Sequence, residues 1–235
     1  MASTHKPKYR GAKGKVSSHR KMMLSNGLLR FAVYEKNRAK QIEEKWQRKP
    51  ELIQIHAGLC ISCLFMLVAF LEAQINEFLS IPILNHPALT VISRFDRNIS
   101  TLQRYQAVAE ILSERFDEGK SDFQKVRIIL ILRNMYTHFI PKFVEYDPDT
   151  LIPIEKNKLE SMLMRYKLGR NPMVANSAEY FPHGCLSAKL CTFGIDSIAR
   201  FVIKFYKRVA PDSDWPIDVI RRALSQDDDL DRTQY

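Results

Sequence analysis

Arg133, Asn134 and His138 are the residues of this sequence whose types and spacing best suit chemistry. Arg133 offers a fixed fork of N–H donors that matches a phosphate, and His138 can give or take a proton near neutral pH. On a helix, Asn134 and His138 stack one turn apart on one face, and Thr137 lies below Arg133 in the same way. The pattern predicts that Arg133, Asn134 and His138 converge on one small ligand, where they suit phosphodiester chemistry without a metal.

The same residues also have a purely structural interpretation, in which His138 is a satisfied buried histidine beside a salt bridge at a helix end. The setting favours chemistry. The apolar run 128–132 ends directly before Arg133, and Pro141, which cannot continue a helix, follows soon after His138. We expect a helix that ends just beyond His138, and both interpretations stay open.

Arg133-Asn134-x-x-x-His138 resembles the signature of the higher eukaryotes and prokaryotes nucleotide-binding (HEPN) superfamily, an Arg followed after four to six residues by His. A second stretch, Leu-Glu-Ala-Gln-Ile-Asn at 71–76, is similar to an early core helix of the same superfamily. The resemblance covers roughly residues 50–208. It implies an antiparallel helical bundle.

The resemblance also implies a metal-independent endoribonuclease. His138 would act as general base or acid on the 2′-hydroxyl and the leaving oxygen, Arg133 would stabilise charge on the phosphate, and Asn134 would position the phosphate or His138. The products would be a 2′,3′-cyclic phosphate and a 5′-hydroxyl, with no cofactor and no metal. Members commonly form homodimers in which two motifs face each other, and toxin or antiviral-defence roles with a regulatory partner protein are frequent.

Four further residues take supporting roles in this picture. Glu72 and Asn76 stack one turn apart on their helix and would lie near the Arg/His motif, either to orient it or to hold two helices together. The alternative is that they only satisfy buried polar groups. Tyr136 and Thr137 either contact RNA or pack.

Two other hypotheses compete with the ribonuclease. One is a HEPN-like module that binds RNA, a nucleotide or a partner protein without cutting. The other is a membrane-associated helical protein that uses the basic N-terminal arm and the apolar run 57–71, in which only Ser62 is polar. That run is shorter than the about 20 residues of a typical span. We therefore expect a buried central helix, no stable membrane insertion and a cytoplasmic protein.

The net charge of +10 lies entirely in the first 48 residues, which carry 13 Lys or Arg against three acidic residues. Residues 49–235 contain 23 of each sign. Such an arm favours a polyanion, with nucleic acid first and an anionic membrane surface second, or it is a solvated tail. We expect residues 1–18 to be disordered because they lack apolar periodicity.

Four cysteines, Cys60, Cys63, Cys185 and Cys191, do not form a disulfide framework. Cys60 and Cys63 have the spacing of a metal or redox pair, but they lie inside an apolar helix. We interpret all four as small core residues in a reducing compartment.

Helical periodicity and prolines divide the rest of the chain. We predict helices at 21–46, 51–79 (opened by Pro50), 101–116, 155–166 and 185–209, and a further helix that Ser121 or Asp122 caps and that carries Arg133. Loops are predicted at 81–87 and 169–184. The first helix should bury Met23, Leu24, Leu28, Phe31, Ala32 and Ile42. The fold class is all-α, an antiparallel bundle of about five or six helices. One domain spans 19–210, and 211–235 form an acidic tail.

Overall fold

The computed structural model describes residues 24–45, 49–80, 87–94, 99–112, 114, 119–138, 158–174, 180–212 and 215–225. Every regular element in these ranges is helical, which confirms the all-α prediction. The elements are α1 (Ser25–Lys45), α2 (Pro50–Leu79), α3 (Pro87–Arg94), α4 (Thr101–Ile111), α5 (Ser121–Thr137), α6 (Lys158–Met164), the π-helical turn η2 (Tyr180–Gly184), α7 (Ala188–Val209) and α8 (Trp215–Ser225). The basic arm 1–18, Pro141 and the acidic stretch 226–231 lie outside the described residues.

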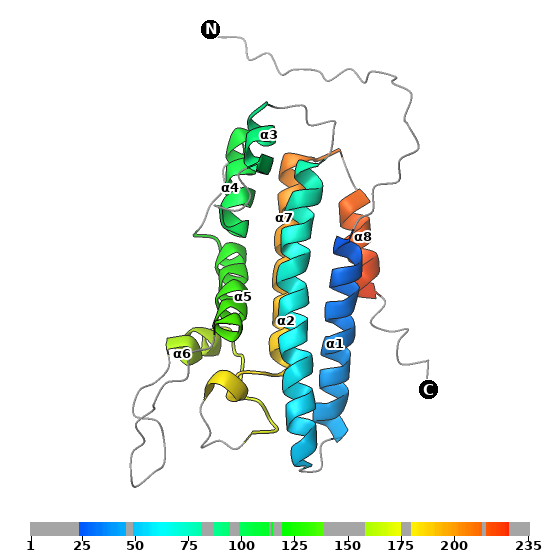
Figure 1. Ribbon diagram of the computed structural model, residues 1–235, viewed down its shortest axis with the longest axis vertical. Coiled ribbons are helices and arrows are strands. Elements are labelled where there is room, and N and C mark those ends of the chain that lie inside the picture. Colours follow the sequence, from blue (N-terminus) through cyan, green and yellow to red (C-terminus); the bar gives the residue numbers. More distant parts are fainter. Residues whose placement is uncertain are drawn as a thin grey trace.

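The long helix α2 is the centre of the fold, with α1, α5 and α7 packed against it (Figure 1). It begins with Pro50 in its first turn, as predicted, where the missing N–H costs no hydrogen bond. Leu64, Leu67, Phe70 and Leu71 are fully buried along it. Among the described helices, α2 alone is long and apolar enough to cross a membrane, a test that the core helix of a soluble protein also passes.

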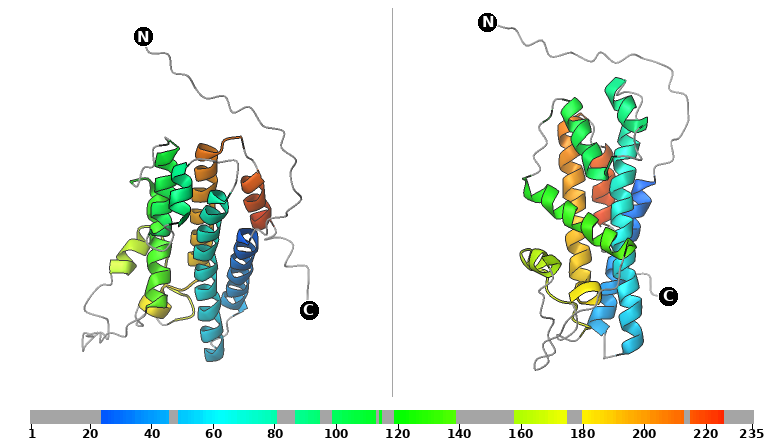
Figure 2. Two further views of the ribbon diagram at one scale, coloured as in Figure 1. Left: turned by 45° about the horizontal axis from the view of Figure 1, so that its top comes forward. Right: turned by 60° about the vertical axis from the view of Figure 1, so that its left-hand side comes forward.

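The helices α4 and α5 lie together on one side of the α2–α7 pair, and α8 lies on the other side, against α1 (Figures 1 and 2). α5 crosses the pair obliquely. Near its start Asp122 forms a salt bridge with Lys204 of α7, and near its end Arg133 forms one with Glu72 of α2. Between these two contacts α5 buries Phe123, Val126, Ile129 and Leu132, and this apolar face sets the direction in which the helix presents its other side chains.

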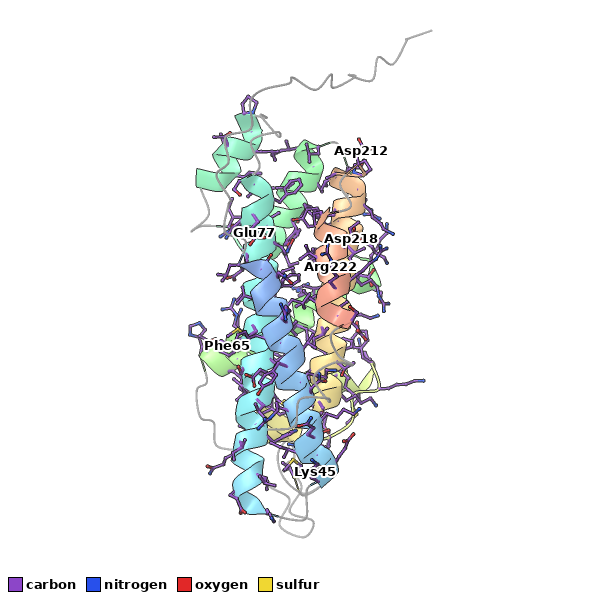
Figure 3. The ribbon with its side chains drawn as sticks, turned by 90° about the vertical axis from the view of Figure 1, so that its right-hand side faces the viewer. Lys45, Phe65, Glu77, Asp212, Asp218 and Arg222 are labelled. Atoms are coloured by element: carbon purple, nitrogen blue, oxygen red, sulfur yellow. The ribbon has the colours of Figure 1, made fainter. Side chains whose placement is uncertain are left out.

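The orientation of α1 differs from the predicted apolar face. Leu24 and Phe31 were expected to be buried, but their side chains are 64% and 59% exposed. The cause lies in the first turn, where Ser25 donates a hydrogen bond of 2.6 Å from its hydroxyl to the carboxylate of Glu77. Figure 3 labels Glu77 on α2, beside α1. Because Ser25 must face α2, Leu29, one turn later, becomes the buried residue.

Two short helices add to the predicted set, so the described residues form eight α-helices rather than five or six. α3 begins at Pro87, which the sequence interpretation placed in a loop. α8 lies within the stretch expected to be an acidic tail, and it buries Ile217, Ile220 and Ala223. In both helices a proline in the first turn is tolerated, although it looks like a loop signal in the sequence.

The predicted ends of α4 and α5 also need correction. α4 stops at Ile111, five residues before the predicted end. The N-cap of α5 is Lys120, without a side-chain capping bond, and not Ser121 or Asp122. Asp122 is in the first turn of the helix, where its negative charge interacts favourably with the positive N-terminal end of the helix dipole.

The stretch 169–184 was expected to be a surface loop, but Asn171 and Met173 are buried. Asn171 accounts for this difference. Its backbone N–H donates to the carbonyl of Gly184 at 2.7 Å, and its side-chain amide donates to the carbonyl of His183 at 3.2 Å. These bonds tie the segment to η2.

The side chain of Glu43, near the C-terminal end of α1, contacts both α2 and α7. One oxygen of its carboxylate accepts the Ala188 backbone N–H of α7 at 2.7 Å and lies 2.8 Å from Nε2 of the buried His56 on α2. The four cysteines are buried and none forms a disulfide, which agrees with their interpretation as core residues.

Candidate functional site

A groove of about 590 Å³ lies between α4 and α5, above Glu72 of α2. We call it the α4–α5 groove. Three arginines line it: Arg104 from α4, and Arg127 and Arg133 from α5. Asn134 and Gln103 contribute amide groups. A concave surface with three guanidinium groups and one carboxylate is suited to anions with several acceptor oxygens.

Arg133 is held in place by Glu72. Its Nη2 donates a hydrogen bond of 3.2 Å to Oε1 of Glu72, and Thr101 of α4 donates to the same oxygen at 3.2 Å. The Arg133 side chain is 26% exposed. Its Nε is buried and has no hydrogen-bond partner among the described residues. The guanidinium is thus oriented by one contact and keeps a buried donor for an incoming oxygen.

Asn76 does not join Arg133. It is exposed, and its side-chain oxygen accepts a hydrogen bond of 2.9 Å from Nη1 of Arg104. Of the two residues that the sequence placed near the motif, the structure brings Glu72 to Arg133 and places Asn76 beside α4. Asn76 therefore positions an arginine of the groove that the sequence interpretation did not include.

His138 lies where α5 ends. Its backbone N–H still donates to the carbonyl of Asn134 at 2.9 Å, but its own φ and ψ of −117° and 41° leave the helical region. His138 is therefore the C-cap of α5 and follows Asn134 by four residues.

The side chain of His138 is exposed, so the interpretation as a satisfied buried histidine is wrong. The salt bridge in that interpretation does exist, between Arg133 and Glu72. Asn134 is exposed and lines the α4–α5 groove, whereas His138 is not among the described residues that line it. Within a single chain, Arg133 and Asn134 line the same groove, and His138 is exposed at the surface outside the described lining of that groove.

Tyr136 packs in the fold. Its hydroxyl donates to the carbonyl of Pro182 at 2.5 Å and lies 3.1 Å from the sulfur of Cys185, and its ring contacts Phe181 at 5.0 Å between centroids. Burial raises the pKa of Tyr136 well above its usual value. Thr137 is exposed and donates its hydroxyl to the carbonyl of Arg133 at 2.9 Å, inside the same helix. Tyr136 thus fastens the end of α5 to η2.

Sequence reasoning missed Arg104 and Arg127. Arg127 could have been found, because it lies seven residues before Asn134 and so shares a face of α5 with it. Arg104 could not, since only the packing of α4 on α2 brings it to the groove. In the described part of the chain, no group of three or more His, Cys, Asp or Glu side chains could hold a metal ion.

Comparisons with known proteins add no family to these observations. The chain matches no family model, no curated protein and no solved structure. The functional inference therefore stands on the α4–α5 groove and on the C-terminal turn of α5.

Proposed function

We propose that this protein is a metal-independent endoribonuclease with a HEPN-like helical bundle. It cleaves RNA by attack of a 2′-hydroxyl on the adjacent phosphate. The observation that carries this proposal is the state of Arg133. Glu72 holds it at an arginine-rich groove, while its Nε is buried and has no partner among the described residues. His138 follows on the same helix end, where its imidazole is exposed.

In the proposed reaction His138 takes the proton of the 2′-hydroxyl, or gives a proton to the leaving 5′-oxygen. The bond from O2′ to phosphorus forms as the bond from phosphorus to O5′ breaks, and the proton ends on O5′. Arg133 donates to a non-bridging phosphate oxygen and stabilises the charge that grows there. Asn134 positions the phosphate. The products are a 2′,3′-cyclic phosphate and a 5′-hydroxyl.

A homodimer completes this site in our proposal. One imidazole cannot be base and acid in the same step, so a second His138 from another copy supplies the missing role. The exposed position of His138, away from the groove of its own chain, supports such a composite site. A toxin or antiviral-defence role, with a partner protein that restrains cleavage, is an extension of the same proposal.

The test is a cleavage assay on mixed RNA with EDTA present, using the full chain and its Arg133→Ala and His138→Ala variants. We expect cyclic-phosphate products, and rates lowered roughly 100-fold or more in both variants. Arg200→Ala and His183→Ala are matched controls, because both residues are exposed and lie outside the motif. Loss of activity in His183→Ala alone would assign the proton transfer to a different histidine.

A non-catalytic module that binds RNA, a nucleotide or a partner protein is the second candidate. It is favoured by the fact that the groove is built without His138. Such a module would bind an RNA oligonucleotide equally well after His138→Ala. A folded wild-type dimer that binds RNA and leaves it intact would replace the ribonuclease proposal with this one.

A further inference from the structure

A second concave region of about 420 Å³ lies where the start of α5 meets the end of α7. We call it the α5–α7 hollow. Its floor is apolar and includes Phe123 and Phe201. Four cationic side chains line it, from both helices: Lys120, Lys204, Lys207 and Arg208. An apolar floor with several cations around it suits a ligand that carries both a flat apolar group and negative charge.

The hollow and the α4–α5 groove are neighbours, because Phe123 lines both. On α5, Arg127 of the groove follows Phe123 by one turn. On α4, Ala109 of the hollow follows Gln106 of the groove by three residues, so both lie on one face of that helix. The two regions therefore lie next to each other along α5, and we refer to the pair as the channel. From the start of α5 to Arg133 this channel spans about 18 Å at the rise of an α-helix.

Charge is concentrated along this channel. Among the described residues that line the hollow and the groove, seven are Lys or Arg and two are acidic. Both acidic residues, Asp122 and Glu72, already form salt bridges with channel cations. Residues 49–235 are neutral as a whole, with 23 charges of each sign. The excess of basic side chains along the channel is therefore a local feature. An excess of cations along a concave surface suits the phosphate backbone of a single-stranded nucleic acid.

We propose that the α5–α7 hollow is the second phosphate-binding segment of a single-stranded RNA track that leads along α5 to Arg133. Lys207 and Arg208, whose side chains are exposed, bind backbone phosphates. These are positioning residues, which set where the strand enters the groove. The inference rests on the proposed ribonuclease function for the choice of RNA, and it adds the path by which the strand reaches the site.

The test compares two pairs of adjacent basic residues. The double variant Lys207→Gln/Arg208→Gln changes the hollow, near the C-terminal end of α7. The control Arg221→Gln/Arg222→Gln changes an equivalent exposed pair near the end of α8. Figure 3 shows Arg222 on α8 in front of the bundle, with α4 and α5 behind it. The probe is a fluorescent 2′-O-methyl oligonucleotide, which has no free 2′-hydroxyl and stays intact.

We expect the hollow variant to bind the probe more weakly than wild type. The slope of log K against log salt should fall by about 1.4, since each phosphate contact on a single strand contributes about 0.7. On cleavable RNA the variant should raise KM more than it lowers kcat. The α8 control should keep the wild-type slope. If the hollow variant does not fold, Lys120→Gln on α5 provides an independent loss of about 0.7 in slope.

The outcomes separate this inference from the proposed function. Cleavage by wild type together with an unchanged salt slope in the hollow variant overturns the track and leaves the ribonuclease standing. A reduced slope in a chain that never cleaves supports the track and overturns the ribonuclease. An equal loss of slope in the α8 control overturns the track, because binding then follows total charge and not position.

Discussion

Arg133 of α5 and Glu72 of α2 are 61 residues apart in sequence and are joined by a hydrogen bond of 3.2 Å. The same carboxylate oxygen accepts Thr101 of α4. One acidic residue on the central helix thus anchors both helices that form the α4–α5 groove. It also sets the direction of the guanidinium to which we assign charge stabilisation.

We expect Glu72→Gln to lower the rate of RNA cleavage while the free energy of unfolding changes by less than about 1 kcal/mol, because the pair is partly exposed. Glu160→Gln is the matched control, since Glu160 forms a salt bridge of 3.1 Å with Arg170 outside the groove. The measurements are kcat/KM and urea unfolding. An equal loss of activity in both variants would show that Glu72 does not orient Arg133 in particular.

The buried Cys185 and the partly buried Tyr136 predict a loss of stability at alkaline pH. Burial raises the pKa of Cys185 to about 11 from a usual value of 9.0, and burial also raises that of Tyr136. Because the unfolded chain ionises first, it binds fewer protons than the folded chain above about pH 9, so stability falls as pH rises. Each such group contributes about 1.4 kcal/mol per pH unit. Urea midpoints across this range measure the slope.

The variant Tyr136→Phe separates the hydrogen bond of the Tyr136 hydroxyl from the effect of its raised pKa on stability. At neutral pH the loss of the hydrogen bond to the Pro182 carbonyl should cost about 1–2 kcal/mol. In the alkaline range the decline should be shallower than in wild type, since one raised pKa is removed. A decline of unchanged slope would mean that Tyr136 does not ionise in the unfolding transition.

Gly194 of α7 marks a close approach of three helices. A Cβ at this position would lie 2.8 Å from Cδ1 of Leu67 on α2 and 3.4 Å from Cδ1 of Ile129 on α5. We expect Gly194→Ala to destabilise the fold by about 1 kcal/mol, because overpacking outweighs the gain in helix propensity. Gly58→Ala on α2 meets nothing within 4 Å and should stabilise by about 0.5–1 kcal/mol. Thermal unfolding of both variants tests the pair, and equal shifts would contradict it.

The carboxylate of Glu77 caps the start of α1. It accepts the backbone N–H groups of Leu24 and Ser25 at 2.9 and 3.0 Å, in addition to the Ser25 hydroxyl. We expect Glu77→Gln to cost about 1–2 kcal/mol. Glu51→Gln, in the exposed first turn of α2, should cost under about 0.5 kcal/mol. Denaturant unfolding gives the difference, and faster hydrogen exchange in the first turn of α1 should accompany it.

Much of the fold could be predicted because its long helices carry strong local signals. Pro50 begins α2, and the apolar period of α7 is clear from its sequence. The rotation of α1 could not be predicted, since it depends on a contact between Ser25 and Glu77, 52 residues away. Local periodicity shows that a helix is amphipathic, but the partner decides which face is buried.

The candidate site divides in the same way. The spacing of Arg133 and His138 is visible in the sequence, whereas the groove depends on how α4 and α5 pack on α2. Arg104 enters the site because α4 packs on α2, where its Nη1 donates to the side-chain oxygen of Asn76. His138 departs from helical φ and ψ as the C-cap of α5, and a simple helical projection does not include that effect.

The cap at Glu77 also defines a practical boundary for truncation. The backbone groups that it holds begin at Leu24, so a chain that starts at Met23 keeps all three of these hydrogen bonds. That shorter chain lacks seven basic residues and no acidic ones, and its formal net charge falls from +10 to +3. Electrostatic attraction by the N-terminal arm can thereby be separated from recognition along α5, in a protein whose helical anchors are intact.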